Sequence, residues 1–368
     1  MSFLLSYCFF PAHFTARSYY GENYVVYVDE REYKFSDESL KNNLKSVYHE
    51  PLYSKTIEDK REISKKLIKM GFNKEEILNY LFPGICDEIS KIINENNYEP
   101  VNAEVVFDGV NPFIKNEKNG KKLLKNDLIE LIFDGFLQNN ELSLNIKSSA
   151  ILADVCFEKL NNIIKLKGFF ETPIRGTNQE GRIHNIKQAL SKLDGKKIEN
   201  REKFSFNNAI GNTTKENGYS IAKVIINGKY EDDYGGGVCQ AATTLYNALL
   251  YAGIDVNSVR GHSLKVGYVE PSFDAMVSYG ISDLVFTNNT GEPIYVKTYV
   301  DNSCAQVYIY GVNNEFTIKR RSEVLDYDES YPENVNYKSK GYLEYYKDDY
   351  LVRTKNIRSD TYYKLTNV

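Results

Sequence analysis

Cys239 follows three glycines and a valine in the run Gly235-Gly236-Gly237-Val238-Cys239-Gln240. Apolar residues then recur at helical intervals, so we predict a helix that begins beside the cysteine and ends near Gly253. The first N–H groups of a helix are free and its dipole is positive there, which favours a thiolate over a thiol. We therefore predict that Cys239 is a nucleophile. A turn without Cβ atoms also lets a substrate backbone come close, which makes Gly236 and Gly237 candidate binding residues.

A reactive thiol needs a base that takes its proton and a second group that holds the base. Of the four histidines, His262 is the one near Cys239 in sequence. Residues 259–269 alternate like a strand and residues 273–277 begin another, which puts His262 and Asp274 on neighbouring strands. We predict Cys239, His262 and Asp274 as the catalytic set, with Asp283 as the rival for the orienting carboxylate.

Further polar and aromatic residues are candidates for holding a substrate. Gln240 and the backbone N–H of Cys239 could donate to an oxyanion, and Tyr219 could line a groove. Arg182 and Arg260 suit peptide carboxylates because a guanidinium group forms paired hydrogen bonds with them. Each has a plainer interpretation: a packed helix start for the thiol, core packing for the tyrosine and surface ion pairs for the arginines.

Composition narrows the classes of function. The chain has 368 residues, 42% hydrophobic and 26% charged, which is ordinary for folded protein. Its net charge of −4 gives no basic excess to neutralise phosphates, so we predict no nucleic-acid partner. The five cysteines are scattered without the spacing of zinc ligands or of a disulfide framework. We therefore predict no metal and no cofactor.

The periodicity of the chain predicts an α+β protein. Residues 1–17 are apolar but too short to span a membrane, and we interpret them as an export signal or a first buried strand. A small α/β domain follows over residues 18–167, with strands near 24–28 and 103–107, a helical region between 36 and 97, a helix over 121–138 and a returning strand over 143–151.

From residue 168 onward, glycine, asparagine and aromatic residues become more frequent. A helix opens at Arg182, and a strand over 221–226 leads into the glycine run. Residues 294–300 and 305–310 form a hairpin around Asp301-Asn302-Ser303. Residues 313–368 form a short β-rich extension. The order of a helix-borne cysteine, then histidine, then aspartate resembles the layout of transglutaminase-like and papain-like α+β folds.

Residues 168–312 resemble the VanW family in many motifs that occur in order. The motifs are Phe204-Ser205-Phe206-Asn207, Gly211, Gly218-Tyr219, Gly235-Gly236-Gly237-Val238-Cys239-Gln240, Thr243-Thr244-Leu245-Tyr246-Asn247, His262-Ser263, Asp274-Ala275 and Asp283-Leu284 with Asn288-Asn289-Thr290. The chain departs from the family at Ala242, where serine is more frequent, and at Phe273, where arginine is. The segments Val106-Phe107-Asp108-Gly109 and Gly120-Lys121-Lys122-Leu123 are similar to the peptidoglycan-binding domain that often precedes VanW domains.

The resemblance implies a cell-wall protein, at the cell surface or secreted, with a membrane tether through its N-terminus as one arrangement. For VanW domains that are catalytic it implies L,D-transpeptidase activity, in which Cys239 forms a thioester with a donor stem peptide of peptidoglycan and an acceptor stem resolves it. Two alternatives stay open. Water could resolve the thioester, which would make the protein a cysteine peptidase or carboxypeptidase. The domain could also be a non-catalytic peptidoglycan-binding or glycopeptide-resistance accessory module.

Overall fold

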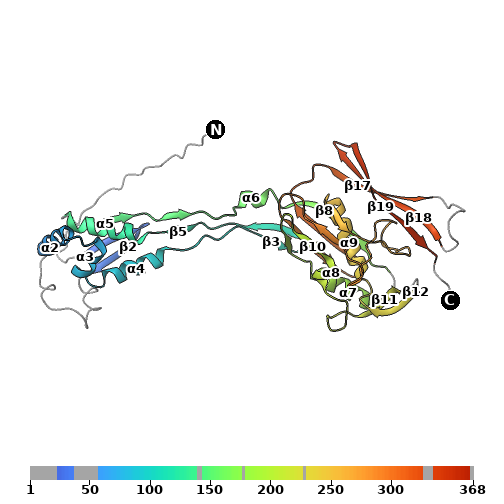
Figure 1. Cartoon of the computed structure of the whole chain (residues 1–368), viewed down its shortest axis with the longest axis horizontal. Coiled ribbons are helices and arrows are strands. Elements are labelled where there is room, and N and C mark those ends of the chain that lie inside the picture. The colour runs from blue at the N-terminus through green and yellow to red at the C-terminus, as the bar shows by residue number, and fades with distance from the viewer. Residues whose placement is uncertain are drawn as a thin grey trace. The chain divides into compact units, whose positions relative to one another are not determined.

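The computed structural model describes residues 23–36, 57–138, 143–175, 179–226, 229–325 and 335–364. The chain forms two compact units, one of residues 1–101 with 118–153 and one of residues 102–117 with 154–368 (Figure 1). Helices and strands occur in both, so the predicted α+β class is confirmed. The predicted signal or strand at residues 1–17 lies outside the described residues, and the predicted boundaries at 167/168 and 312/313 stay predictions. None of the described helices is long and apolar enough to cross a membrane.

The first unit packs four described helices against one small sheet and also contains a separate pair of strands. In one sheet the order is β2-β1-β6, with β2 antiparallel and β6 parallel to β1, and in the other β5 pairs with β7. Leu78, Ile89 and Phe133 are fully buried in the core between them. The elements are β1 (Asn23–Val28), β2 (Arg31–Ser36), α2 (Ile57–Lys69), α3 (Lys74–Leu81), α4 (Ile85–Asn96), β5 (Gly120–Lys122), α5 (Lys125–Leu137), β6 (Ser143–Ile146) and β7 (Ser149–Ile151).

The predicted helical region between residues 36 and 97 contains three helices in its described part, α2, α3 and α4. Asn73 starts α3 because its side chain accepts from the N–H of Glu76 while Glu76 bonds back to the N–H of Asn73. The single returning strand predicted over 143–151 is wrong. It consists of two short strands, β6 and β7, which belong to different sheets.

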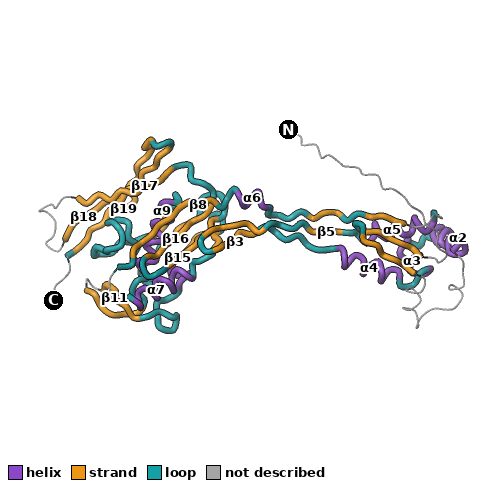
Figure 2. Tube along the Cα trace, turned by 180° about the vertical axis from the view of Figure 1, so that it is seen from behind, coloured by secondary structure: helices purple, strands orange, loops and turns teal. Residues whose placement is uncertain are grey.

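The second unit is built on an antiparallel sheet of order β8-β16-β15-β9. Figure 2 shows β8, β16 and β15 side by side, with α9 and α7 beside them, and α9 packs on β8 and β16 while α7 packs on β15. These elements are β8 (Lys165–Pro173), α7 (Glu180–Ser191), β9 (Lys196–Ile198), α9 (Val238–Tyr251), β15 (Ile294–Val300) and β16 (Cys304–Gly311).

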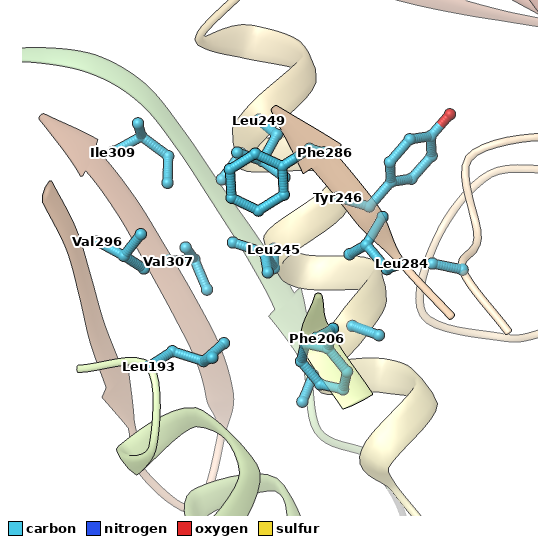
Figure 3. Packing of buried hydrophobic residues seen from close by; sticks show 14 of the residues in the cluster. Leu193, Phe206, Leu245, Tyr246, Leu249, Leu284, Phe286, Val296, Val307 and Ile309 are labelled. Atoms are coloured by element: carbon cyan, nitrogen blue, oxygen red, sulfur yellow. The ribbon is translucent and has the colours of Figure 1, made fainter. Parts of the chain in front are cut away.

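Helix α9 is the centre of this unit, and every residue of it from 240 to 250 is buried. Its buried polar side chains Thr243, Thr244 and Asn247 all have hydrogen-bond partners, which allows the helix to lie inside the unit. Figure 3 shows Leu245 and Leu249 of α9 among the side chains of the sheet, including Val307. The helix ends as predicted, because Gly253 follows in the left-handed conformation with φ 69°.

The predicted hairpin around Asp301 is confirmed. Strands β15 and β16 pair from Tyr295 with Tyr310 to Val300 with Ala305. One carboxylate oxygen of Asp301 accepts from the N–H groups of Ser303 and Cys304, at 2.7 and 2.9 Å, and so fixes the turn.

Smaller elements surround this core. Strands β10, β14 and β13 form one sheet, β11 pairs with β12, β3 pairs with β4, and β17, β18 and β19 form a sheet in that order. Their bounds are β3 (Glu104–Asp108), β4 (Asn111–Lys115), α6 (Phe157–Asn161), β10 (Lys203–Ser205), α8 (Phe206–Ile210), β11 (Ile221–Ile226), β12 (Lys229–Tyr234), β13 (Val256–Ser258), β14 (Val285–Thr287), β17 (Thr317–Leu325), β18 (Val335–Lys347) and β19 (Tyr350–Tyr363).

The two strands predicted over 259–269 and 273–277 are wrong, because both stretches are irregular. Isolated backbone bonds join them, from the N–H of Met276 to the carbonyl of Arg260 at 2.7 Å and from the N–H of Tyr363 to the carbonyl of Ser263 at 2.8 Å, and side chains of α9 bond to other backbone groups. Thr243 Oγ1 accepts from the N–H of Ala275 at 2.9 Å, and Asn247 Nδ2 donates to the carbonyl of Phe273 at 2.8 Å. The alternating pattern therefore belongs to a long loop whose backbone is held in part by side chains of α9.

Candidate functional site

The glycine run forms the turn that starts α9 at Val238. Gly235 and Gly237 have φ angles of 86° and 108°, which residues with a side chain rarely adopt. A Cβ on Gly236 would lie 2.7 Å from the carbonyl oxygen of Lys223 on β11. The run is thus required by the turn and by close packing against β11. All three glycines also line the pocket described below.

Cys239 is the second residue of α9 and is half-buried. Its sulfur lies 3.4 Å from the carbonyl oxygen of Val277, to which it can donate. The N–H groups of Val238 and Gln240 bond to Gly235 and Gly237, whereas no acceptor for the N–H of Cys239 is found among the described residues. That N–H is therefore available to a ligand beside the sulfur.

The structure brings His262 and Asp274 to Cys239. Asp274 Oδ2 accepts from the backbone N–H of His262 at 2.6 Å and lies 2.7 Å from the ring Nδ1. The carboxylate is fully buried. His262 and Cys239 line the same pocket, and His262 is near enough to the sulfur to lower the pKa of the thiol. Thiol, imidazole and carboxylate thus stand in sequence, as in acyl-transfer sites.

Electrostatics favour a charged pair at this site. Burial of the Cys239 thiol raises its pKa, but the hydrogen bond and charge of His262, the Val277 carbonyl contact and Arg182 outweigh burial and lower the pKa. Burial opposes charging of His262, yet Asp274 and Cys239 raise the pKa of the imidazole to about 9. The pKa of Asp274 falls to about 2 despite burial, because His262 and Arg358 stabilise the carboxylate. Both shifts favour the thiolate–imidazolium form of the pair over the thiol–imidazole form.

Cys239 and His262 line a pocket of about 850 Å³. Such a volume suits a small or peptide ligand. The walls come from the glycine run, the start of α7, strands β11 and β12, and the loop around residues 266–268 and 276–279. Among the described residues, no group of three or more His, Cys, Asp or Glu side chains is arranged to hold a metal ion.

Gln240 and Arg182 lie together at the pocket. Arg182 Nη2 donates to Gln240 Oε1 at 2.7 Å, and the guanidinium lies 5.8 Å from the centre of the Tyr268 ring. Gln240 Nε2 donates to Thr172 Oγ1 at 3.1 Å and to the carbonyl of Pro173 at 3.0 Å. Because the Gln240 amide is engaged at both ends, it ties α9 to β8. The Cys239 N–H is the better placed of the two predicted oxyanion donors.

The structure does not bring the other predicted residues to the sulfur. Tyr219 is buried in the hydrophobic core and is not among the residues that line the pocket, so its packing interpretation fits better than a groove role. Arg260 is exposed and also does not line the pocket. Asp283, the rival carboxylate, accepts from Ser205 Oγ at 2.6 Å and from the N–H of Asn207 at 2.9 Å. It therefore holds the start of α8.

Sequence reasoning missed three side chains around the site. Tyr268 lines the pocket, and its ring lies 5.8 Å from the guanidinium of Arg182. Arg358 and Tyr362 of β19 both donate to Asp274 Oδ1 at 2.9 Å. No local pattern marks them. The alternating pattern of β19 predicts a strand, but it does not predict which part of the chain that strand contacts.

The fold and site define an α+β protein with a thiol, an imidazole and a carboxylate at an open pocket. Residues 181–310 match the family described as VanW like protein. Over 200 residues the chain is 31% identical to the uncharacterized protein YoaR of Bacillus subtilis strain 168, covering 54% of this chain and 65% of YoaR. Over 118 residues it is 31% identical to the vancomycin B-type resistance protein VanW of Enterococcus faecalis strain ATCC 700802 / V583, covering 30% of this chain and 42% of that protein.

Residues 181–310 therefore form a VanW family domain. The chain spans less than two thirds of the length of both relatives. No solved structure matches it.

Proposed function

We propose that this protein is a cysteine-dependent acyltransferase, an L,D-transpeptidase that cross-links stem peptides of peptidoglycan. The observation that carries the proposal is the Cys239 thiol with its lowered pKa, paired with an imidazole that a buried carboxylate holds, in a pocket of about 850 Å³. The similarity to a protein named for vancomycin resistance supports a cell-wall substrate.

In the first step the Cys239 thiolate attacks the carbonyl carbon of the third residue of a donor tetrapeptide. The carbonyl oxygen becomes an oxyanion next to the free N–H of Cys239, and a donor fixed at that place stabilises the transition state. The His262 imidazolium then gives its proton to the nitrogen of the departing D-alanine. The products are a thioester, free D-alanine and neutral His262.

In the second step a side-chain amine of an acceptor stem attacks the thioester carbonyl. His262 takes a proton from this amine, and the carbon–sulfur bond breaks as the new amide forms. The thiolate and the imidazolium are restored, so no external oxidant, reductant or cofactor is consumed. Asp274 keeps the Nδ1 side of the ring occupied in both steps, which leaves Nε2 to exchange protons.

The pocket offers cationic groups for the carboxylates of a stem peptide. Arg175 and Arg182 both line it. One nitrogen of Arg182 is bonded to Gln240, and the rest of its guanidinium lies close enough to the sulfur to lower the pKa of the thiol. The sequence suggested Arg182 and Arg260 for this role, and Arg182 is the better supported of these two because it lines the pocket.

The wider context is part of the same proposal. A cysteine at the start of a buried helix that packs on an antiparallel sheet supports a transglutaminase-like or papain-like arrangement of residues 168–312. We assign the protein to the cell surface or to the secreted fraction, with residues 18–167 as its peptidoglycan-binding part and the N-terminus as a membrane tether.

Analysis of peptidoglycan from cells that express either the wild type or Cys239→Ala tests this function. We expect the wild type to add links between two third-position residues and the variant to add none, because loss of a nucleophile lowers turnover by about 10⁵-fold. Cys86→Ala, which leaves the site intact, serves as the matched control.

Two results would contradict transfer. Trimmed stems without new links would show that water resolves the thioester, and the protein would be a peptidase or carboxypeptidase. Wall that is identical for the wild type and Cys239→Ala would leave a non-catalytic binding or resistance-accessory module.

A further inference from the structure

The carboxylate of Asp274 has two faces with different partners. Oδ2 receives both contacts from His262. Oδ1 receives Arg358 Nη2 and the hydroxyl of Tyr362, each at 2.9 Å. Arg358 and Tyr362 are on β19, more than 80 residues further along the chain, and beyond residue 310, where the VanW family match ends.

Arg358 uses its whole guanidinium fork in this position. Nη1 donates to the carbonyl oxygen of Asp274 at 2.7 Å, and Nε donates to Asp360 Oδ2 at 2.7 Å. The Arg358 side chain is 10% exposed and that of Asp274 is 1% exposed. A planar group with several fixed donors can serve these acceptors together, which the single ammonium of lysine cannot do.

Tyr362 fixes the loop that carries Asp274. Its hydroxyl accepts from the backbone N–H of Ser272 at 2.8 Å while it donates to Asp274. Ser272 is fully buried with φ 66°, a left-handed conformation that a residue with a side chain adopts at a cost. Its Oγ also bonds to Ser339 Oγ of β18 at 2.6 Å. The C-terminal sheet thus holds the loop at two points.

We propose that Arg358 and Tyr362 are positioning residues, which hold Asp274 and through it His262 in the orientation that Cys239 requires. The benefit of this positioning for catalysis rests on the proposed function. The positioning itself rests on the contacts that β19 makes with Asp274. It assigns the β17-β18-β19 sheet to the working site, although the sheet lies outside the part of the chain that matches the family.

Several other ionisable groups face this centre and enter any pH measurement. They come from α7, α9, the loop, β17, β18 and β19, and are Arg182, Tyr246, Tyr268, Arg320, Tyr337 and Asp360. Burial raises the pKa of Tyr246 to about 12 and raises the pKa of Tyr362 and of the other two tyrosines, so these phenols stay neutral near pH 7. The alkylation profile therefore reports the charge state of the Cys239 and His262 pair.

The test measures the rate of Cys239 alkylation by iodoacetamide as a function of pH, in the full chain. Arg358→Lys keeps the charge and loses the fork, so the carboxylate turns and fewer molecules hold the charged pair. We expect its midpoint to rise and its rate at pH 6 to fall about tenfold, which corresponds to one pKa unit. Tyr362→Phe removes one hydroxyl and should lower that rate about threefold.

Tyr337→Phe is the matched control. Its ring stacks on Tyr362 with centroids 5.0 Å apart, and its buried hydroxyl has no hydrogen-bond partner in the described part of the chain. We expect its alkylation profile to equal that of the wild type. Thermal melts of all variants report folding separately, and Tyr362→Phe keeps the proposal testable if Arg358→Lys does not fold.

Unchanged or lowered midpoints in folded Arg358→Lys and Tyr362→Phe would overturn the positioning role. The readout does not depend on turnover. A wild type that forms no cross-links while its thiol reacts at low pH would therefore defeat the proposed function and leave the positioning role standing.

Discussion

Cys86 and Cys239 occupy the same position in helices of the two units. Each is the second residue of its helix, α4 or α9. Each helix is preceded by a glycine in the left-handed conformation, Gly84 with φ 90° and Gly237 with φ 108°. Both thiols are half-buried. By the argument from helix ends alone, the two should be similarly activated.

Their pKa values nevertheless shift in opposite directions. Burial and the nearby Glu75 raise the pKa of Cys86. Burial also raises the pKa of Cys239, but His262 and then Arg182 more than reverse it. The difference between the two thiols therefore comes from the groups around each sulfur, since the helix position is the same.

Removing His262 should abolish the difference between the two cysteines. In the wild type at pH 6.5, we expect iodoacetamide to modify Cys239 at least about tenfold faster than Cys86, because the thiolate is the reacting species. In His262→Ala the ratio should fall to about one or below, and cross-linking should fall by about 10³-fold. Mass spectrometry of the two peptides from one digest measures both rates, so Cys86 is an internal standard.

A ratio that survives the loss of His262 would contradict this account. It would show that the start of helix α9, rather than His262, activates the thiol. His184→Ala is the control, since His184 bonds to the carbonyl of Gly218 at 2.8 Å and does not line the pocket.

The pH dependence of turnover tests whether Cys239 and His262 form a charged pair. The thiol must lose its proton and the imidazole must keep its own, so activity should rise as pH passes the lowered pKa of Cys239 and fall as pH passes about 9, the raised pKa of His262. Initial rates with a soluble tetrapeptide donor between pH 5 and pH 10 measure both limbs. A falling limb near pH 6.5, where an ordinary histidine titrates, would mean that the charged pair does not form.

Replacement of Arg182 should change the reactivity of Cys239 less than replacement of His262 or a change of pH does. Among the groups that lower the pKa of Cys239, Arg182 has the weakest influence, so Arg182→Gln should slow Cys239 alkylation at pH 6.5 by about twofold. The rate of Cys86 alkylation should stay constant. Lys187→Gln, which removes an exposed charge from the same helix, is the control. A loss as large as that of His262→Ala would show that Arg182, rather than His262, is the main partner of the thiolate.

Local patterns predicted much of this molecule. The helical spacing after Cys239 and the glycine at residue 253 predicted α9, and alternation around Asp301 predicted the β15–β16 hairpin. The placement of His262 beside Cys239 was also predicted, since a scarce residue close in sequence had few rivals.

The rest depends on contacts that no local pattern contains. Alternation over 259–277 predicted strands, but Thr243 and Asn247 supply the hydrogen bonds that a neighbouring strand would have supplied. The glycine run indicated a close approach, and the approaching backbone is that of β11. Arg358 and Tyr362 meet Asp274 only because the β17-β18-β19 sheet packs on the loop.

The position of Arg358 and Tyr362 near the far end of the sequence has a consequence for biosynthesis. A ribosome makes the chain from its N-terminus, so the sulfur, the imidazole and the carboxylate all emerge before either donor from β19 exists. The loop with Asp274 therefore cannot be locked while the intervening residues are being translated. During that interval the nascent chain carries its thiol without the two contacts that β19 makes with Asp274.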